Sequence, residues 1–240
     1  MNILEKILQE RLELSDDKIH VYLIQFNLFD SENCIQYLSE VERHRAERLK
    51  IDEKKNQFVI TRSVLRFLLS SAISKTCQEI EFFYGEHGKP GINDCLNDKP
   101  IEFNISHSGN YALIAITLSN KLGVDIEEIN PDIDHHSLSK RFFSKQENLE
   151  LQGVSVEQRR DIFYRVWTRK ESFIKATGKG VTFGLERFSV SLNEGSEAGL
   201  EVKTSVQLDN EYFTYNLMDV EGYKTALTTS ARNSEIVIHT

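Results

Sequence analysis

Two short segments of this chain combine charged side chains with a regular spacing that could support catalysis. In residues 161–180 (DIFYRVWTRKESFIKATGKG), apolar side chains recur with a helical period, and four-residue steps lead from Phe163 through Trp167 to Glu171 and Lys175. Burying a carboxylate on such a face costs roughly several kcal/mol unless a cation, a metal ion or hydrogen-bond donors meet it. The pattern therefore fits either a Glu171–Lys175 pair on a half-exposed helix edge or a functional site.

The second segment, KLGVDIE at residues 121–127, alternates as a β-strand does. Asp125 and Glu127 point to one side of that strand, so two carboxylates share a face about 7 Å apart. If the helix that carries Glu171 packs across this strand, three carboxylates converge. An all-oxygen set suits Mg²⁺ or Mn²⁺ better than Zn²⁺ and leaves room for substrate phosphate. Lys175, one helical turn from Glu171, would offer a positive charge to a leaving phosphate.

Other candidate residues lie in the elements that would position these acids. The runs IEFNIS and YALIAIT flank a turn at Gly109 and Asn110, which predicts a β-hairpin with His107 beside Ser106 at its tip. Residues 57–74 predict a long apolar helix with Arg62 in its apolar stripe. A structural salt bridge and a ligand contact fit Arg62 equally well.

Beyond residue 180 the pattern changes to strands, at 188–192, 200–206, 212–218, 223–228 and 235–239. We interpret them as an antiparallel meander over the preceding helices, serving as scaffold. Each half of the chain runs from a strand through a helical region and a long apolar helix to further strands. This favours an α+β fold of two pseudo-symmetric lobes, residues 1–121 and 122–240, with the three acids in the second lobe.

The composition excludes several classes of protein. With a net charge of −8 over 240 residues, the chain lacks the basic face that proteins need to coat nucleic acid. Its most cationic stretch, residues 40–55, could still meet a small polyanion. No apolar run reaches the roughly 20 residues that span a membrane. Cys34, Cys77 and Cys95 have no C-x-x-C spacing, which favours reduced thiols and a cytoplasmic protein over a disulfide frame or zinc site.

Four blocks of sequence together resemble a known family. They are FNISHSG (residues 103–109), GVDIE (123–127), RFFSKQE (141–147) and WTRKESFIK (167–175). Their order and spacing are similar to those of the 4′-phosphopantetheinyl transferases of the larger, surfactin-synthetase-activating type, and weaker similarity covers about residues 40 to 230.

The resemblance implies a monomer with coenzyme A in the cleft between two lobes. Such an enzyme moves the 4′-phosphopantetheine arm of coenzyme A onto a serine of an acyl, peptidyl or aryl carrier protein and releases adenosine 3′,5′-bisphosphate. By position, Asp125, Glu127 and Glu171 match the magnesium ligands, and Glu171 also matches the proposed base for the carrier serine. The residues that match phosphate contacts are Lys175, His107 and Ser106.

The same resemblance implies which residues border the adenine nucleotide: the turn formed by His87, Gly88, Lys89 and Pro90. It also implies that Arg45 is a cation near the 3′-phosphate. One position departs from the family pattern. Many relatives have an arginine just before the first Phe of the long helix, and this chain has Gln57. Lys54, Lys55 or Arg62 would then have to supply that charge.

Carrier proteins of this kind tend to be acidic, with an apolar helix beside the serine, so the surface around Phe142, Phe143 and Lys145 is the expected docking region unless the two Phe are core. Two other functions use the same residues. One is a magnesium-dependent pyrophosphohydrolase that directs the three acids onto water. The other is a carrier-binding module without catalysis, which the intact set of acids and Lys175 disfavours.

Overall fold

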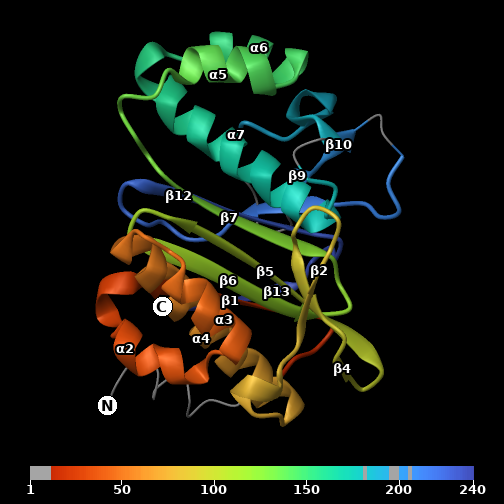
Figure 1. The fold of residues 1–240 in the computed structure, drawn as a ribbon. Coiled ribbons are helices and arrows are strands. Elements are labelled where there is room, and N and C mark those ends of the chain that lie inside the picture. The colour runs from red at the N-terminus through yellow and green to blue at the C-terminus, as the bar shows by residue number, and fades with distance from the viewer. Residues whose placement is uncertain (1–11, 181–182, 195–199, 205–206) are drawn as a thin grey trace.

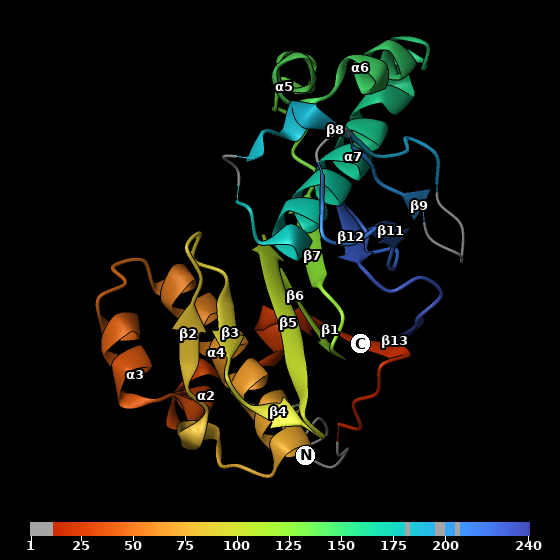
Figure 2. The same cartoon turned by 90° about the vertical axis from the view of Figure 1, so that its right-hand side faces the viewer.

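The computed structural model describes residues 12–180, 183–194, 200–204 and 207–240, and in it two β-sheets lie face to face with a long helix outside each (Figure 1 and Figure 2). The mixed α/β architecture expected from the sequence is confirmed. The elements of the first half are β1 (Lys18–Gln25), α2 (Ser31–Cys34), α3 (Glu40–Glu47), α4 (Asp52–Ile73), β2 (Phe82–Tyr84), β3 (Pro90–Ile92), β4 (Cys95–Leu96), β5 (Lys99–Ser108) and β6 (Tyr111–Leu118). Those of the second half are β7 (Leu122–Glu128), α5 (His135–Phe142), α6 (Lys145–Gln152), α7 (Val156–Thr177), β8 (Phe188–Ser189), β9 (Leu200–Glu201), β10 (Lys203–Thr204), β11 (Phe213–Asn216), β12 (Tyr223–Thr229) and β13 (Glu235–His239).

The first sheet has the strand order β13-β1-β6-β5-β4, and helix α4 covers one of its faces. Apolar residues of α4 such as Val64 and Leu68 pack against Ile114 and Ile116 of β6. The strands alternate, so β6 sends its other residues, Leu113 among them, into a second core between the sheets. Both faces of this sheet are therefore buried.

The second sheet has the order β7-β12-β11-β9 and is covered by α7 on its outer face. Helices α5 and α6 pack against the N-terminal part of α7, at the top of Figure 1. Like α4, α7 has 22 residues, and each of the two long helices lies across one sheet. The helix predicted at 161–180 ends as expected, because Gly178 adopts a φ of 67° and its amide bonds back to Ile174.

Three boundaries differ from the sequence prediction. Helix α4 begins at Asp52 rather than at Gln57, with acidic residues in its first turn. Residues 137–151 are rich in helix-forming residues and predict a helical stretch, which the structure divides into two helices because Ser144 and Glu147 form a capping box that starts α6. The strand expected at 200–206 is split between β9 and β10, and residues 205–206 lie outside the described residues.

The prediction that 235–239 belongs to the C-terminal meander is wrong. Strand β13 pairs in parallel with β1, from Lys18 opposite Glu235 to Tyr22 opposite His239. It covers the edge of β1 that β6 leaves open, which satisfies backbone groups that an edge strand would expose. Residues 1–11 of the expected first lobe lie outside the described residues, and the division at residue 121 stays a prediction.

No described helix has both the length and the apolar character that crossing a membrane requires.

Candidate active site

Strand β7 presents two of the predicted acids to helix α7. Its residues Leu122, Val124 and Ile126 are buried in the core between the sheets, so Asp125 and Glu127 point the other way. Asp125 is only 2% exposed, whereas Glu127 is half-buried. The two carboxylates share one face, as the alternation of the strand predicts.

Helix α7 lies directly against β7 at Gly123. A Cβ atom at this position would lie 2.1 Å from the carbonyl oxygen of Ser172. That oxygen belongs to the helix backbone, so no side-chain rotation could relieve the contact. Glycine here allows α7 to lie directly on the strand and to bring Glu171 and Lys175 close to Asp125.

Two other charged residues of the WTRKESFIK segment anchor the helix. Lys170 is fully buried, pairs with Glu147 at 2.8 Å and donates to two backbone carbonyl oxygens. Arg169 is also fully buried and donates to Asn216 Oδ1 at 2.9 Å. Burial lowers the pKa of both cations, to about 10 for Arg169. Their contacts fix the rotation of α7 about its axis and so the direction in which Glu171 points.

Lys175 contacts the β7 acids directly. Its Nζ atom lies 2.6 Å from Asp125 Oδ1 and 2.9 Å from Ser106 Oγ. The Ser106 hydroxyl also donates to Asp125 Oδ1, at 2.8 Å. The structure thus brings together three residues that the sequence assigned to metal and phosphate contacts, and pairs Lys175 with an acid that the sequence did not predict as its partner.

All three predicted acids have raised pKa values. Burial raises the pKa of Asp125 in spite of its contact with Lys175. Burial and then the nearby Asp125 charge raise the pKa of Glu127 to about 7, and the same two causes raise the pKa of Glu171. Glu127 and Glu171 therefore each lie close enough to Asp125 to be repelled by its charge, and ionising them beside it costs free energy unless a cation is present.

The donor atoms fit a hard divalent cation. The set is all oxygen, and Asp125 Oδ2 is buried with no hydrogen-bond partner among the described residues. In the part of the chain that the structure describes, however, no three His, Cys, Asp or Glu side chains are grouped tightly enough to hold an ion. With Lys175 on Asp125, the carboxylates are neighbours but do not surround a common point.

Side chains of β5 join the two sheets at this site. Asn104 Oδ1, Ser106 Oγ and Ser108 Oγ accept hydrogen bonds from the amides of residues 124, 126 and 128, at 2.9, 3.4 and 3.0 Å. Strand β7 pairs with β12 on its other edge, so these amides face away from its own sheet. Ser108 also donates to Glu127 Oε2 at 3.2 Å. These three hydrogen bonds from β7 amides to β5 side chains set the register between the FNISHSG and GVDIE segments.

Asn104 and Ser108 are site residues that the sequence reasoning missed. The sequence feature that could have identified them is the two-residue spacing of polar side chains in NISHS. That spacing matches the two-residue spacing of the amides along the free edge of a neighbouring strand. Because no sequence pattern names β7 as that neighbour, the match becomes visible only in the folded chain.

His107 lies at the tip of the β5–β6 hairpin, on the face of β5 that also carries Phe103 toward α4. The residue is solvent-accessible, yet its pKa is lowered, first by desolvation of the ring and then by the charges of Lys54 and Lys175. A histidine between two lysines is a setting that favours an anion. Two residues further on, Gly109 has a φ of 52° and leaves no room for a side chain against Tyr223 and Glu128.

A cavity of about 440 Å³ opens beside α7 and joins residues from both halves of the chain. The predicted nucleotide-binding turn and the two charged residues of α7 line it together. The lining residues are His87, Gly88, Lys89, Pro90, Asn104, Ile105, Glu171, Ile174, Lys175, Gly178 and Gly180. Residues more than 80 positions apart in the sequence thus line one cavity. Asp125 of β7 is next to this cavity, because it contacts the lining residue Lys175.

Lys89 links this turn to the start of β7. Its Nζ atom donates to the carbonyl oxygen of Leu122 at 3.0 Å and lies 4.0 Å from a Glu102 carboxylate oxygen. Burial lowers the pKa of Lys89 to about 8. Lys89 is therefore a half-buried cation at the cavity, unlike the exposed lysine that a turn usually contains.

Arg62 and Arg45 are predicted nucleotide contacts that lie outside this cavity. Arg62 is 7% exposed, pairs with Glu42 at 3.3 Å and lies over the Phe82 ring. Burial lowers its pKa. Its contacts are those of the structural salt bridge that the sequence left open. Arg45 is exposed on α3, with its guanidinium carbon 5.0 Å from the centre of the Phe58 ring.

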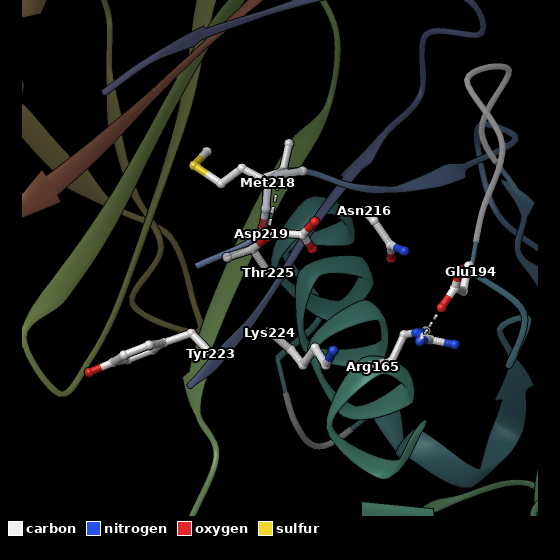
Figure 3. A pocket seen from close by; sticks show the side chains of 9 residues that line it. Arg165, Glu194, Asn216, Met218, Asp219, Tyr223, Lys224 and Thr225 are labelled. Atoms are coloured by element: carbon white, nitrogen blue, oxygen red, sulfur yellow. Dashed lines mark hydrogen bonds and ion pairs between the residues drawn. The ribbon is translucent and has the colours of Figure 1, made fainter. Parts of the chain in front are cut away.

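A second cavity, of about 360 Å³, lies along another edge of α7 (Figure 3). Both of its cations have acidic partners: Arg165 contacts Asp161 and Glu194, and Lys224 contacts the same Asp161. The hydroxyl of Thr225 is likewise bonded to a backbone carbonyl. This cavity contains none of the residues that the sequence predicts as functional.

Comparison with known proteins places both halves of the chain in one group. A family model described as "4′-phosphopantetheinyl transferase superfamily" matches residues 121–228, and one described as "4′-phosphopantetheinyl transferase, N-terminal" matches residues 29–119. A putative 4′-phosphopantetheinyl transferase of Synechocystis sp. is 40% identical over 62% of this chain, and the match spans 61% of that protein, less than two thirds of its length.

Two further relatives match over more of their length. The 4′-phosphopantetheinyl transferase HetI of Nostoc sp. is 34% identical over 79% of this chain and 81% of its own. The 4′-phosphopantetheinyl transferase Sfp of Bacillus subtilis is 33% identical over 73% of this chain and 76% of its own. At this identity and coverage, with three of the four sequence blocks meeting around one site, the chain belongs to the 4′-phosphopantetheinyl transferase family.

Proposed function

We propose that this protein transfers the 4′-phosphopantetheine group of coenzyme A to a serine of an apo acyl or peptidyl carrier protein and releases adenosine 3′,5′-bisphosphate. Membership of the transferase family supports this activity. The single observation that carries the assignment of the site is the shared cavity, in which Glu171 and Lys175 face the turn of residues 87–90. The cleft between residues 1–121 and 122–240 is the proposed place for coenzyme A.

Glu171 is the proposed base. In the transfer, the serine oxygen of the carrier attacks the phosphorus that carries the pantetheine arm, the bond from that phosphorus to the bridging oxygen of the pyrophosphate breaks, and the serine proton passes to Glu171. A raised pKa suits a carboxylate for this role, because it must accept a proton near neutral pH. Lys175 and His107 supply positive charge and hydrogen bonds for the phosphates, and Ser106 orients Lys175.

We propose Mg²⁺, or Mn²⁺, as the metal, held by Asp125, Glu127 and Glu171. When bound, it would neutralise negative charge on the pyrophosphate oxygens. The repulsion among these acids and the unpartnered Asp125 Oδ2 support a cation at this place. Lys175 contacts Oδ1 of Asp125, which leaves Oδ2 as the oxygen that would bind the ion.

Removal of one acid should stabilise the metal-free protein at high pH. The pKa of Glu127 is raised from an ordinary 4.5 to about 7, so its contribution to stability is greatest below pH 4.5 and is lost as pH rises through about 7. Because the side chain is partly screened by solvent, we expect Glu127→Gln to gain about 1–2 kcal/mol at pH 8 and little at pH 5. Urea unfolding in excess chelator measures both values.

Adding Mg²⁺ at pH 8 should stabilise the wild-type protein more than Glu127→Gln, because the cation then neutralises the same repulsion. A gain from the substitution that is equal at both pH values, or no response of the wild type to Mg²⁺, would contradict the proposed metal site.

Intact-mass spectrometry of apo carriers incubated with coenzyme A and Mg²⁺ tests the transfer itself. We expect the mass of one phosphopantetheine to be added, and little bisphosphate to form when the carrier is left out. Rapid release of bisphosphate without a carrier would favour a pyrophosphohydrolase instead. Binding of the carrier without any mass gain would favour a non-catalytic module.

The proposed docking surface for the carrier is centred on Phe142 and Lys145. Phe143 belongs to the core, stacked on Phe163 at 5.3 Å, whereas Phe142 is half-buried against Trp167 and Lys145 is exposed. We expect Lys145→Glu to raise the KM for an acidic carrier about fivefold, with the KM for coenzyme A unchanged, because a surface charge pair is worth about 1 kcal/mol. Steady-state kinetics with each substrate varied in turn measures both KM values. An unchanged KM for the carrier would show that Lys145 is not part of the docking surface.

A cytoplasmic location and a monomeric state are also proposed. The three cysteines are unpaired, which fits a reducing compartment. The monomeric state is proposed because the family that the sequence blocks resemble implies a monomer of two lobes.

A further inference from the structure

The polar side chains of β5 that face β7 form a row, and Glu102 is its first member. Residues 102, 104, 106 and 108 share one face of the strand, because side chains alternate along it. The last three accept hydrogen bonds from β7 amides. Glu102 meets two lysines instead: its Oε1 atom pairs with Lys121, the residue before β7, and its Oε2 atom lies 4.0 Å from Lys89 Nζ. The row thus begins with a carboxylate between two cations.

Lys89 lies between this carboxylate and the cavity beside α7. It belongs to the turn of residues 87–90 and is one of the residues that line the cavity. Its Nζ atom donates to the carbonyl oxygen of Leu122 at 3.0 Å. That oxygen is neutral, and Glu102 is the one acid within 4.0 Å of the ammonium group among the residues that the structure describes. Leu122 therefore fixes the position of the ammonium group, and Glu102 supplies the negative charge that a half-buried cation needs.

Burial and neighbouring charges compete at Lys89. Desolvation lowers its pKa to about 8, the charge of Glu102 opposes this change, and the charge of Lys121 adds to it. Three further titratable residues line the same cavity: His87, Glu171 and Lys175. Without Glu102 the ammonium group would lose its proton nearer to neutral pH, and a neutral amine attracts an anion far less than an ammonium group does.

We infer that Glu102 is a positioning residue for coenzyme A: it holds the Lys89 ammonium group at the cavity wall, from which Lys89 attracts the phosphates of the nucleotide. Glu102 is not among the residues that line the cavity, so it acts through Lys89. The inference rests on the proposed function. It goes beyond that function because Glu102 lies outside the four sequence blocks, the first of which starts at Phe103.

Lys121 distinguishes this role from a merely structural one. Its ion pair with Glu102 joins β5 to the start of β7, but half of the Lys121 side chain is exposed, so the pair contributes about 1 kcal/mol or less to stability. If Glu102 mattered through this pair, the loss of either partner would have the same effect. If Glu102 acts on Lys89, the loss of Lys121 removes a competitor for Glu102 and a charge that repels Lys89.

Calorimetric titration of coenzyme A into the full-length protein at pH 6.5 and pH 8.5 tests the inference. We expect Glu102→Gln to weaken binding about fivefold at pH 8.5 and less than about twofold at pH 6.5, because Lys89 is protonated in both proteins at the lower pH. Glu102→Asp keeps the negative charge and should recover most of the binding at pH 8.5. Lys121→Gln should not weaken binding at either pH.

The matched control is Glu235→Gln on β13. Glu235 also pairs with a lysine of a neighbouring strand, Lys18 at 3.4 Å, and neither residue lines the cavity. This variant should bind coenzyme A as the wild type does at both pH values. Each affinity is compared with that of the wild type at the same pH, which cancels the titration of groups that the variants share.

The Lys89 ammonium group, followed by NMR without ligand, gives a readout that does not depend on binding. Its pKa should fall in Glu102→Gln, where an attracting charge has been removed, and rise in Lys121→Gln, where a repelling charge has been removed. A pKa of Lys89 that is the same in Glu102→Gln as in the wild type would overturn the inference.

Three binding results would also overturn it: equal weakening by Glu102→Gln at the two pH values, unchanged binding in that variant, or an equal loss in Lys121→Gln. A wild-type protein that does not bind coenzyme A would overturn the proposed function, and the inference with it. A wild-type protein that binds coenzyme A and forms the holo carrier, but whose Glu102 variants give any of these three results, overturns the inference alone.

Discussion

Glu171→Gln should lose most transfer activity, about 10²- to 10⁴-fold in kcat, with the fold intact. The substitution preserves shape but removes the base that takes the serine proton, and it removes one of three proposed metal ligands. Stability should not fall, because ionised Glu171 is half-buried beside Asp125 and its pKa is raised by both causes. The measurement is the initial rate of holo-carrier formation by intact-mass spectrometry, alongside thermal unfolding.

The control for Glu171→Gln is Glu157→Gln on the same helix. Glu157 is exposed in the first turn of α7, far along the helix from the cavity. It undergoes the same chemical change, so its transfer rate should equal that of the wild type. Wild-type-like transfer by Glu171→Gln would contradict both roles assigned to this carboxylate, since neither a base nor a charged ligand would then be needed there.

Gly123→Ala should damage stability and activity together. The new Cβ would lie 2.1 Å from the Ser172 carbonyl oxygen, a distance that side chains never tolerate against backbone, so α7 must move away from β7. We expect the free energy of unfolding to fall by about 3 kcal/mol, at the upper end of overpacking effects. Displacement of Glu171 and Lys175 by about 1 Å should also reduce transfer by about 100-fold.

Urea unfolding and transfer rates below the new melting temperature separate these two effects. Gly153→Ala is the matched control, because Gly153 ends α6 with a negative φ and its new Cβ would lie 3.3 Å from the Glu150 carbonyl oxygen, away from the cavity. That variant should change stability by less than about 1 kcal/mol and leave transfer unchanged. A folded Gly123→Ala protein with wild-type transfer would show that the close approach of α7 is not what positions the site.

Short-range patterns predicted the elements of the site well. The helical period places Glu171 and Lys175 one turn apart on α7, and strand alternation places Asp125 and Glu127 on one face of β7. The hairpin predicted around Gly109 forms between β5 and β6. These features depend on backbone geometry over a few residues, which is the range in which sequence patterns are informative.

The roles of the individual charged residues could not be predicted from the sequence as well as the elements could. Arg169, Lys170, Glu171 and Lys175 are all charged residues of one helix, yet the first two are fully buried anchors and the last two line the cavity. Burial of a lysine is tolerated only where a partner such as Glu147 is present, and that partner comes from another helix. The sequence left a structural salt bridge and a ligand contact equally open for Arg62, because it does not show that Glu42 meets this arginine in the core.

By itself the amino-acid sequence determined the type of each element, the faces that carry the acids, the four sequence blocks and, through them, the family. Only the tertiary structure decided which elements became neighbours: β13 beside β1, the β5 side chains on the free edge of β7, and Lys175 on Asp125 across 50 residues. The physical reason is that a local period sets the direction of a side chain, whereas its partner depends on long-range packing of whole sheets and helices. Chemistry at this site is a property of those long-range pairs.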